Sequence, residues 1–205
     1  MSWALVYTYG MIIYLHGFSS GAASNKAGMF RRALSETPFL ILEYPAHQPH
    51  AAVSSITRSI TQALSEYPGE ELTLMGSSLG GFYAQFLAAA LDAVDRVVMI
   101  NPALQPQLTL KPFVGHNTNM VTGKPFEFCQ QDFADLSDYD TGPVPPGKPT
   151  LVLLDEADEL IDVGVALRRY TTAGKVIVYP GGSHQFEHID EAVPEIRKFL
   201  ASLNA

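Results

Sequence analysis

Short, unbroken runs of apolar residues recur along this chain and alternate with segments of helical pattern. Continuous Val, Ile and Leu content is typical of strands buried on both faces of a parallel sheet. We expect strands at 11–17, 39–45, 71–77, 96–102, 149–156 and 175–182. Helices are predicted at 24–36, 51–67, 80–92, 159–173 and 187–203. Alternating strands and helices form βαβ units, so the pattern predicts the α/β class, with a mostly parallel sheet and helices on both faces.

The alternation breaks once, at residues 103–148. This segment is rich in proline and glycine, shows no strong periodicity, and is too long for an ordinary connection. We expect a short cap inserted over one end of the sheet. Ligands bind beyond the carboxyl ends of the strands in such sheets, so the cap is expected to shape the pocket. Candidates for an apolar wall are Phe113, Phe126, Phe128 and Phe133, although ordinary packing beneath a loop accounts for them equally well.

The length of 205 residues suits a single domain over 1–205 with a sizeable core. Residues 1–10 are apolar but lack the basic region and the small-residue cleavage site of a signal peptide. We interpret them as an N-terminal extension whose role is open. No stretch of 18 uncharged apolar residues occurs, which argues against a membrane span.

Charge and cysteine content narrow the partners and the compartment. The formal net charge is −8 and no run of Lys or Arg occurs, which disfavours nucleic acid and anionic membranes as partners. The single cysteine, Cys129, cannot form an internal disulfide and has no metal-ligand spacing around it. We interpret Cys129 as a semi-buried small apolar residue. A cytoplasmic location is therefore expected, while the oligomeric state stays open.

The stretch "LMGSSLGGFYA" at 74–84 contains a G-x-S-x-G pentapeptide between an expected strand and an expected helix. This is the context of a nucleophile elbow, a sharp turn that needs small residues two positions before and after a strained serine. Ser78 has Gly76 and Gly80 at these positions, whereas the frame centred on Ser77 puts a methionine and a leucine there. Ser78 is therefore the candidate nucleophile.

Two backbone N–H groups are expected to stabilise an oxyanion beside Ser78. One belongs to Leu79, at the positive end of the dipole of the following helix. The other belongs to Phe18 in "YLHGFSS", after the first strand, where Gly17 permits the turn. In this arrangement His16 braces the loop and is not a base.

A serine hydroxyl needs a hydrogen-bonded base, and in this architecture the base follows the acid in the chain. The histidines are at positions 16, 47, 50, 116, 184 and 188. His184 lies in the Gly-rich turn "YPGGSHQF", just after the last strand, and is the preferred base. His188 falls inside the following helix, where it is expected to face solvent or cap the helix. His47 and His50 either line an entrance or are plain loop residues, and we favour the second interpretation.

The stretch "LVLLDEADELIDV" offers several carboxylates as the orienting acid: Asp155, Glu156, Asp158, Glu159 and Asp162. The first two still belong to the strand end. The last two fall in the predicted helix, where they complement its dipole. Asp158 lies in the loop between and is preferred, with Asp155 as the alternative and a plain helix cap as the competing interpretation. No His, Cys and carboxylate cluster has ligand spacing, so we expect no metal.

Several stretches together resemble the YqiA-like family of small bacterial esterases in the α/β-hydrolase superfamily: "MIIYLHGFSSG", "GSSLGGFYA", "KPFVGHNTNMVTGKPFEF", "ADELIDV" and "GGSHQF". The resemblance runs from about Met11 to the C-terminus. The "N-P-A" after the fourth strand and the "T-G-K-P-F" in the cap are more particular than the elbow. Ala157 and Ser183 depart from the family pattern, which often has glycine and asparagine there.

The resemblance implies a triad at Ser78, Asp158 and His184, no cofactor, and hydrolysis of acyl esters with short chains. The substrate is thus expected to be a small-molecule acyl ester cleaved through an acyl-enzyme. A thioesterase or small-amide hydrolase is the alternative on the same triad, since the triad does not choose the leaving group. An alternative of another class is a non-catalytic ligand-binding protein on the same scaffold.

Overall fold

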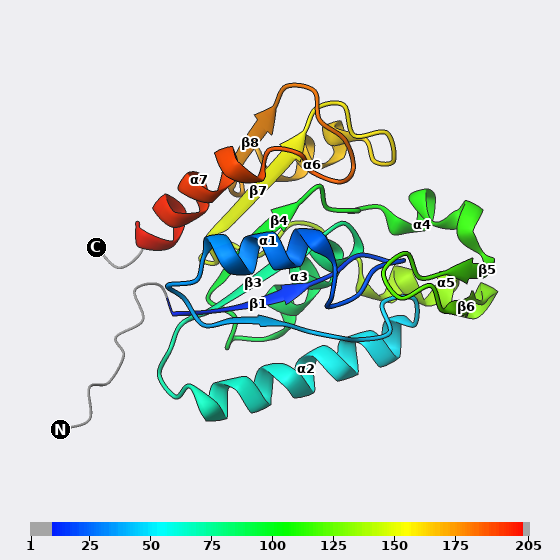
Figure 1. Ribbon diagram of the computed structural model, residues 1–205, viewed down its shortest axis with the longest axis horizontal. Helices are drawn as coiled ribbons and strands as arrows, with labels where there is room; N and C mark the ends of the chain where they lie inside the picture. The colour runs from blue at the N-terminus through cyan, green and yellow to red at the C-terminus, as the bar shows by residue number, and fades with distance from the viewer. Residues whose placement is uncertain (1–9, 203–205) are drawn as a thin grey trace.

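The computed structural model describes residues 10–202 and centres on a parallel six-stranded sheet of order β2-β1-β3-β4-β7-β8 (Figure 1). The strands are β1 (Met11–Leu15), β2 (Phe39–Ile41), β3 (Leu72–Ser77), β4 (Arg96–Ile100), β7 (Thr150–Asp155) and β8 (Lys175–Tyr179). The predicted α/β class is confirmed. The second strand ends earlier than expected, and all but the last residue of the predicted N-terminal extension lie outside the described residues.

Helices cover both faces of the sheet. They are α1 (Asn25–Ala33), α2 (Pro49–Glu66), α3 (Leu79–Ala90), α6 (Val163–Tyr170) and α7 (Ile189–Ala201). Successive strand residues point to opposite faces, so Ile12 and Tyr14 of β1 join a core cluster with α1 and α7. Ile13 and Leu15 join the cluster formed with α2, α3 and α6. Among residues 10–202, no helix is both long and apolar enough to cross a bilayer.

The expected cap contains short regular elements that the sequence pattern did not predict. They are α4 (Pro106–Thr109), the 3₁₀ turn η1 (Lys111–Phe113), strands β5 (Gly115–Thr118) and β6 (Pro125–Phe128), α5 (Gln130–Asp135) and the 3₁₀ turn η2 (Leu136–Tyr139). Strands β5 and β6 pair as an antiparallel hairpin. In Figure 1 these elements lie beyond the carboxyl ends of β1 and β3, the end of the sheet where ligands were expected.

Cys129 corrects one prediction. The residue is exposed rather than semi-buried, because it occupies the N-cap position of α5. Its Sγ accepts a hydrogen bond from the Asp132 N–H and lies 2.9 Å from the Asp132 carboxylate. The thiol therefore caps a helix and does not fill the core.

The strand order places a switch point between β1 and β3. From β1 the chain first forms β2 on one side and later β3 on the other. Leu15 at the end of β1 is in register with Gly76 near the end of β3. In open α/β sheets, ligands bind beyond the strand ends at such a point. The loops that carry Phe18 and Ser78 begin here.

Candidate active site

Ser78 sits at the turn between β3 and α3 in a backbone conformation that residues other than glycine rarely adopt. Its φ is 55° and its ψ −122°, a strain of about 1–3 kcal/mol that the surroundings must hold. A Cβ on Gly76 would collide with the Gly80 carbonyl, and one on Gly80 with the carbonyl that ends β1. The spacing of these glycines around Ser78 is therefore a steric necessity of the turn.

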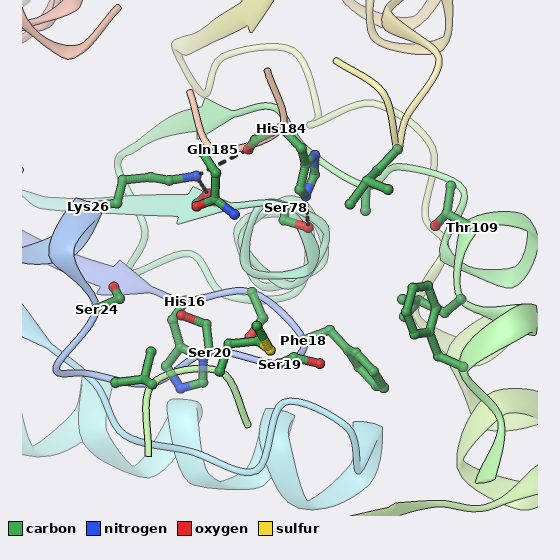
Figure 2. A pocket seen from close by; sticks show the side chains of 18 of the residues that line it. His16, Phe18, Ser19, Ser20, Ser24, Lys26, Ser78, Thr109, His184 and Gln185 are labelled. Carbon is green, nitrogen blue, oxygen red and sulfur yellow. Dashed lines mark hydrogen bonds between the residues drawn. The ribbon is translucent and has the colours of Figure 1, made fainter. Parts of the chain in front are cut away.

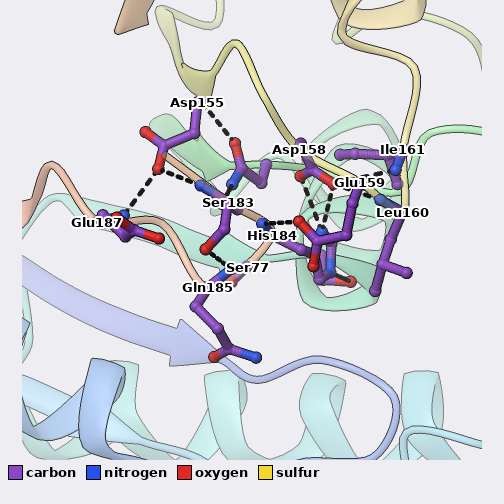
Figure 3. Close-up of polar contacts among 12 residues, drawn as sticks. Ser77, Asp155, Asp158, Glu159, Leu160, Ile161, Ser183, His184, Gln185 and Glu187 are labelled. Carbon is purple, nitrogen blue, oxygen red and sulfur yellow. Dashed lines mark hydrogen bonds and ion pairs between the residues drawn. The ribbon is translucent and has the colours of Figure 1, made fainter. Parts of the chain in front are cut away.

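Ser78, His184 and Asp158 form one chain of hydrogen bonds, with the Ser78–His184 contact in Figure 2 and the His184–Asp158 contact in Figure 3. The Oγ of Ser78 lies 3.0 Å from Nε2 of His184, and Nδ1 of His184 lies 2.8 Å from Oδ2 of Asp158. The Asp158 side chain is fully buried, whereas that of His184 is 13% exposed. An ionised carboxylate only accepts hydrogen bonds, so the proton of a neutral imidazole resides on Nδ1. The lone pair of Nε2 then faces the Ser78 hydroxyl.

The turn after β7 is built around the Asp158 carboxylate. Its Oδ1 accepts hydrogen bonds from the N–H groups of Leu160 and Ile161, at 2.9 and 3.0 Å. This turn delays the next helix, so α6 begins at Val163 instead of 159. Glu159 thus lies outside the helix predicted for it, and its Oε2 accepts the N–H of His184 at 2.9 Å (Figure 3).

A second aspartate, Asp155, organises the loop that carries His184 (Figure 3). Its fully buried carboxylate accepts hydrogen bonds from the N–H groups of Ser183 and Glu187, at 3.2 and 2.7 Å. It also lies 2.8 Å from Nδ1 of His188. His188 occupies the N-cap position of α7, which agrees with one of its two predicted roles, but its side chain makes no cap hydrogen bond and bonds Asp155 instead. Among residues 10–202, the carboxylate of Asp155, the alternative acid, bonds neither Ser78 nor the imidazole of His184.

Asn101 joins this loop to the sheet. It follows β4 with a φ of 41° and is fully buried. Its Oδ1 accepts the Asp155 N–H at 2.9 Å, and its Nδ2 donates to the Ser183 carbonyl at 3.0 Å. The asparagine of the "N-P-A" stretch therefore helps to fix the backbone next to His184.

The two predicted oxyanion donors lie at the ends of β1 and β3. Among residues 10–202, neither the Phe18 N–H nor the Leu79 N–H has a hydrogen-bond acceptor within the protein. A Cβ on Gly17 would lie 3.2 Å from the Cβ of Ser78, so this glycine lets the first loop approach the nucleophile closely. Both N–H groups are available to a ligand atom next to Ser78.

His16 supports the loop after β1 that carries Phe18. Its Nδ1 bonds the Gly17 carbonyl at 2.8 Å, its ring stacks on Tyr44 with centroids 4.4 Å apart, and the Tyr44 hydroxyl donates to the His16 carbonyl. Burial lowers the pKa of His16, which keeps the ring neutral. These contacts agree with the bracing role predicted for His16.

The cap hairpin β5–β6 also packs against the loop that carries Phe18. The Phe18 ring packs edge-on against Phe126 and Phe128, at centroid distances of 5.3 and 4.9 Å. At the hairpin turn, the Asn119 side chain donates to the Ser20 carbonyl and the Met120 N–H donates to the Ser19 carbonyl. The cap thus holds the Phe18 peptide in position.

Of the four phenylalanines considered as an apolar wall, only Phe113 lines the cavity. Phe126 and Phe128 pack against Phe18, and Phe133 packs against Phe128. His47 packs against Phe126 within a loop. His50 corrects the preferred interpretation, because it lies in the first turn of α2 and not in a loop.

Ser78 and His184 open onto a cavity of about 640 Å³ (Figure 2). In Figure 2 Ser24, Lys26 and Gln185 lie to one side of Ser78, which we call the polar side, and Thr109 lies to the other. The apolar residues of the lining are Leu110, Phe113, Met120, Val121, Leu160 and Ile161. The cap also contributes the polar residues Thr109, Asn117 and Thr118.

Lys26 also lines the cavity, although the sequence pattern did not identify it as a site residue. The sequence did contain a signal for Lys26, because a lysine in the first turn of a predicted helix is unfavourable at the positive end of the helix dipole. This predicted helix also follows the expected oxyanion loop in the chain. The sequence also did not predict one group in the described part of the chain that could supply three metal ligands: His50, Asp135 and Asp138. It joins α2 to the cap, and none of its members lines the cavity.

Comparisons with known proteins agree with this fold. The model of "Uncharacterised protein family (UPF0227)" matches residues 11–201. A UPF0227 protein of Pectobacterium atrosepticum is 21% identical, covering 92% of this chain and 98% of its own. The UPF0227 protein YcfP of Salmonella gallinarum is 22% identical with the same coverage.

Solved structures of similar fold include Est1E from Butyrivibrio proteoclasticus, with a TM-score of 0.75 and 15% identity over 96% of this chain and 88% of that one. A monoacylglycerol lipase from Paleococcus ferrophilus has a TM-score of 0.69 and 16% identity, over 95% of each chain. These likenesses identify the α/β-hydrolase fold.

Proposed function

The chain belongs to the UPF0227 family, and from its α/β-hydrolase fold and the contacts of Ser78 we propose that it is a serine hydrolase of short-chain acyl esters. The observation that carries the proposal is the 3.0 Å contact between Oγ of a strained Ser78 and Nε2 of His184. A hydroxyl held this way has a base at the distance needed for proton transfer. We expect an acyl-enzyme on Ser78 as the intermediate.

In the acylation half, Ser78 Oγ attacks the ester carbonyl while its proton moves to His184 Nε2. The N–H groups of Phe18 and Leu79 stabilise the negative charge that develops on the carbonyl oxygen. Asp158 holds the Nδ1–H tautomer and stabilises the imidazolium. The C–O bond to the alcohol then breaks, and His184 returns the proton to the leaving oxygen.

In the deacylation half, His184 takes a proton from a water molecule, which attacks the acyl carbonyl of the acyl-enzyme. The same two N–H groups stabilise the second oxyanion. Collapse releases the carboxylic acid and restores the Ser78 hydroxyl. Every proton that leaves a nucleophile is thus returned to a leaving oxygen through one imidazole nitrogen.

Two further observations support an ester substrate. Est1E, to which this chain is similar in fold, also has a structure described as bound to ferulic acid, and another neighbour is a monoacylglycerol lipase. In this chain, the apolar residues of the cavity lining, among them Leu110, Phe113 and Leu160, suit an acyl chain. A thioester would use the same residues, so acyl-CoA substrates belong in the same panel as p-nitrophenyl esters of increasing chain length.

The Ser78→Ala variant tests the proposal. We expect it to lower kcat for p-nitrophenyl acetate by about 10⁴-fold or more, because the triad acts as a unit, and to abolish labelling by a fluorophosphonate probe. The Ser77→Ala variant, which removes the adjacent hydroxyl, should still be labelled. Wild-type turnover in Ser78→Ala, or wild-type protein that neither turns over esters nor reacts with the probe, would refute the assignment and favour a non-catalytic binding protein.

A further inference from the structure

Lys26 presents an ammonium group to the cavity next to the proposed nucleophile (Figure 2). Its Nζ donates to Ser77 Oγ at 2.9 Å and lies 3.4 Å from the carbonyl oxygen of His184. Both acceptors are neutral, whereas an ammonium has three N–H bonds and a full charge. The ammonium group therefore contacts the residue next to Ser78. It retains an N–H donor and a positive charge that neither acceptor neutralises.

The position of Lys26 is electrostatically costly in the absence of a ligand. Lys26 is partly buried, and no carboxylate of residues 10–202 lies close enough to form an ion pair with it, since Asp158 and Asp155 pair with histidines. Burial lowers the pKa of Lys26 to about 8, against the opposing effect of the Asp158 and Asp155 charges. An anion placed against Nζ would remove this cost.

The helix that carries Lys26 adds to the positive potential. Lys26 lies in the first turn of α1, which has no acidic residue, so the ammonium and the positive end of the helix dipole occupy the same region. Sequences usually place carboxylates there. Departures from such local rules concentrate at functional sites.

The cavity lining shows the same bias. The chain as a whole has a net charge of −8, yet none of the described residues that line the cavity is Asp or Glu. Lys26 is the one lysine among the described lining residues, which include no arginine, and Ser24, Asn25 and Gln185 offer further hydrogen bonds. Apart from Lys26, the lining consists of polar uncharged residues, two histidines and apolar residues such as Leu110, Phe113 and Leu160.

From these observations we infer that the polar side of the cavity binds an anionic group of the substrate, a carboxylate or a phosphate, through Lys26. This inference rests on the proposed function and specifies it: the substrate is an acyl ester that also carries a negative charge. The anion occupies the side of Ser78 formed by α1 and the His184 loop, and the uncharged part occupies the side formed by the cap and Leu160.

Matched pairs of esters test the inference. For an anion on the leaving group, 4-acetoxybenzoate and 4-acetoxyphenyl phosphate are compared with neutral 4-acetoxybenzamide. For an anion on the acyl group, mono-4-nitrophenyl adipate is compared with the corresponding adipamide ester. We expect wild-type kcat/KM to favour the anionic member of at least one pair by about 10-fold or more, as a charge-assisted hydrogen bond would. The preferred pair identifies where the anion lies and whether carboxylate or phosphate fits.

The Lys26→Met variant should lose this preference, with the anionic member falling at least about 10-fold more than the neutral one. Lys26→Arg, which keeps the charge, should retain part of it. Lys111→Met removes a cation from an exposed position on the cap outside the cavity lining and should leave the preference unchanged. Equal kcat/KM within every wild-type pair would overturn the inference, as would an equal loss of both members in Lys26→Met, which would make Lys26 a brace for Ser77 and His184.

Calorimetric binding separates this inference from the proposed hydrolysis. Wild-type protein should bind 4-hydroxybenzoate about 10-fold or more tightly than 4-hydroxybenzamide, and Lys26→Met should bind both alike. This comparison does not depend on turnover. Protein that binds the carboxylate selectively but hydrolyses no ester would refute the proposed function alone, and protein that hydrolyses neutral esters but does not distinguish the two ligands would refute the anion site alone.

Discussion

Asp155 ends β7 and Asp158 lies in the turn that follows, and each of them bonds a histidine of the segment between β8 and α7. In both pairs the carboxylate oxygen is 2.8 Å from Nδ1 of the ring, and both aspartate side chains are fully buried. Each carboxylate also accepts two backbone N–H groups. By burial, distance and hydrogen-bond number, the two pairs are equivalent.

What separates the pairs is the surroundings of the second ring nitrogen. Nε2 of His184 lies 3.0 Å from Ser78 Oγ, whereas the His188 ring stacks nearly parallel on Tyr179, with centroids 5.1 Å apart. An Asp–His pair supplies a base only where Nε2 reaches an exchangeable proton. We therefore expect one pair to serve the chemistry and the other to hold the loop in place.

Replacing each of the two histidines by glutamine should give the largest difference in activity between the two pairs. In His184→Gln the proposed base is lost, and kcat for p-nitrophenyl acetate should fall by about 10⁴-fold or more. His188→Gln keeps a polar side chain at the other pair and should lower kcat by no more than about 10-fold. Stopped-flow or steady-state assays of the two purified variants measure this difference. Similar losses in both would contradict the division of roles.

Asp158→Asn should give a smaller loss, by changing the tautomer of His184. The Asn carbonyl can keep the N–H bonds of Leu160 and Ile161 and turn its amide toward Nδ1. The proton of His184 then moves to Nε2, which can no longer accept the Ser78 proton, and kcat should fall by about 10³- to 10⁴-fold.

Stability controls this experiment. Because the backbone hydrogen bonds of the turn persist, the free energy of unfolding of Asp158→Asn in urea should stay within about 1 kcal/mol of wild type. A loss of activity that accompanies a large loss of stability would show that Asp158 supports the turn and not the imidazole.

Sequence patterns within a few residues were sufficient to predict the central strands and the candidate nucleophile. The apolar runs at β1, β3, β4 and β7 identify buried parallel strands, and the glycines around Ser78 distinguish it from Ser77 by sterics alone. Both signals depend on neighbours within a few residues. The position of His184 after the last strand then follows from the parallel topology, which brings the strand ends to one edge.

The remaining parts of the site depend on contacts between distant segments. The β5–β6 hairpin has little apolar alternation, and it is held by packing of Phe126 and Phe128 on Phe18, far away in the chain. His188 has a helical pattern around it, so its bond to Asp155 is invisible until β7 and β8 are paired. Lys26 likewise gains its meaning only from the acceptors that β3 and the His184 loop provide.

Two substitutions of Asp155 sharpen the comparison with the smallest effect on chemistry. Asp155→Asn can keep the N–H bonds of Ser183 and Glu187 on its carbonyl and offer its amide to Nδ1 of His188. Since that ring serves no proton transfer, the change of tautomer should cost less than about 10-fold in kcat, in contrast to the same substitution at Asp158. Asp155→Ala leaves these buried donors without an acceptor and should lower the free energy of unfolding in urea by about 2–4 kcal/mol. If Asp155→Asn instead abolished turnover as Asp158→Asn is expected to, the two pairs would act as one catalytic network rather than as a base and a brace.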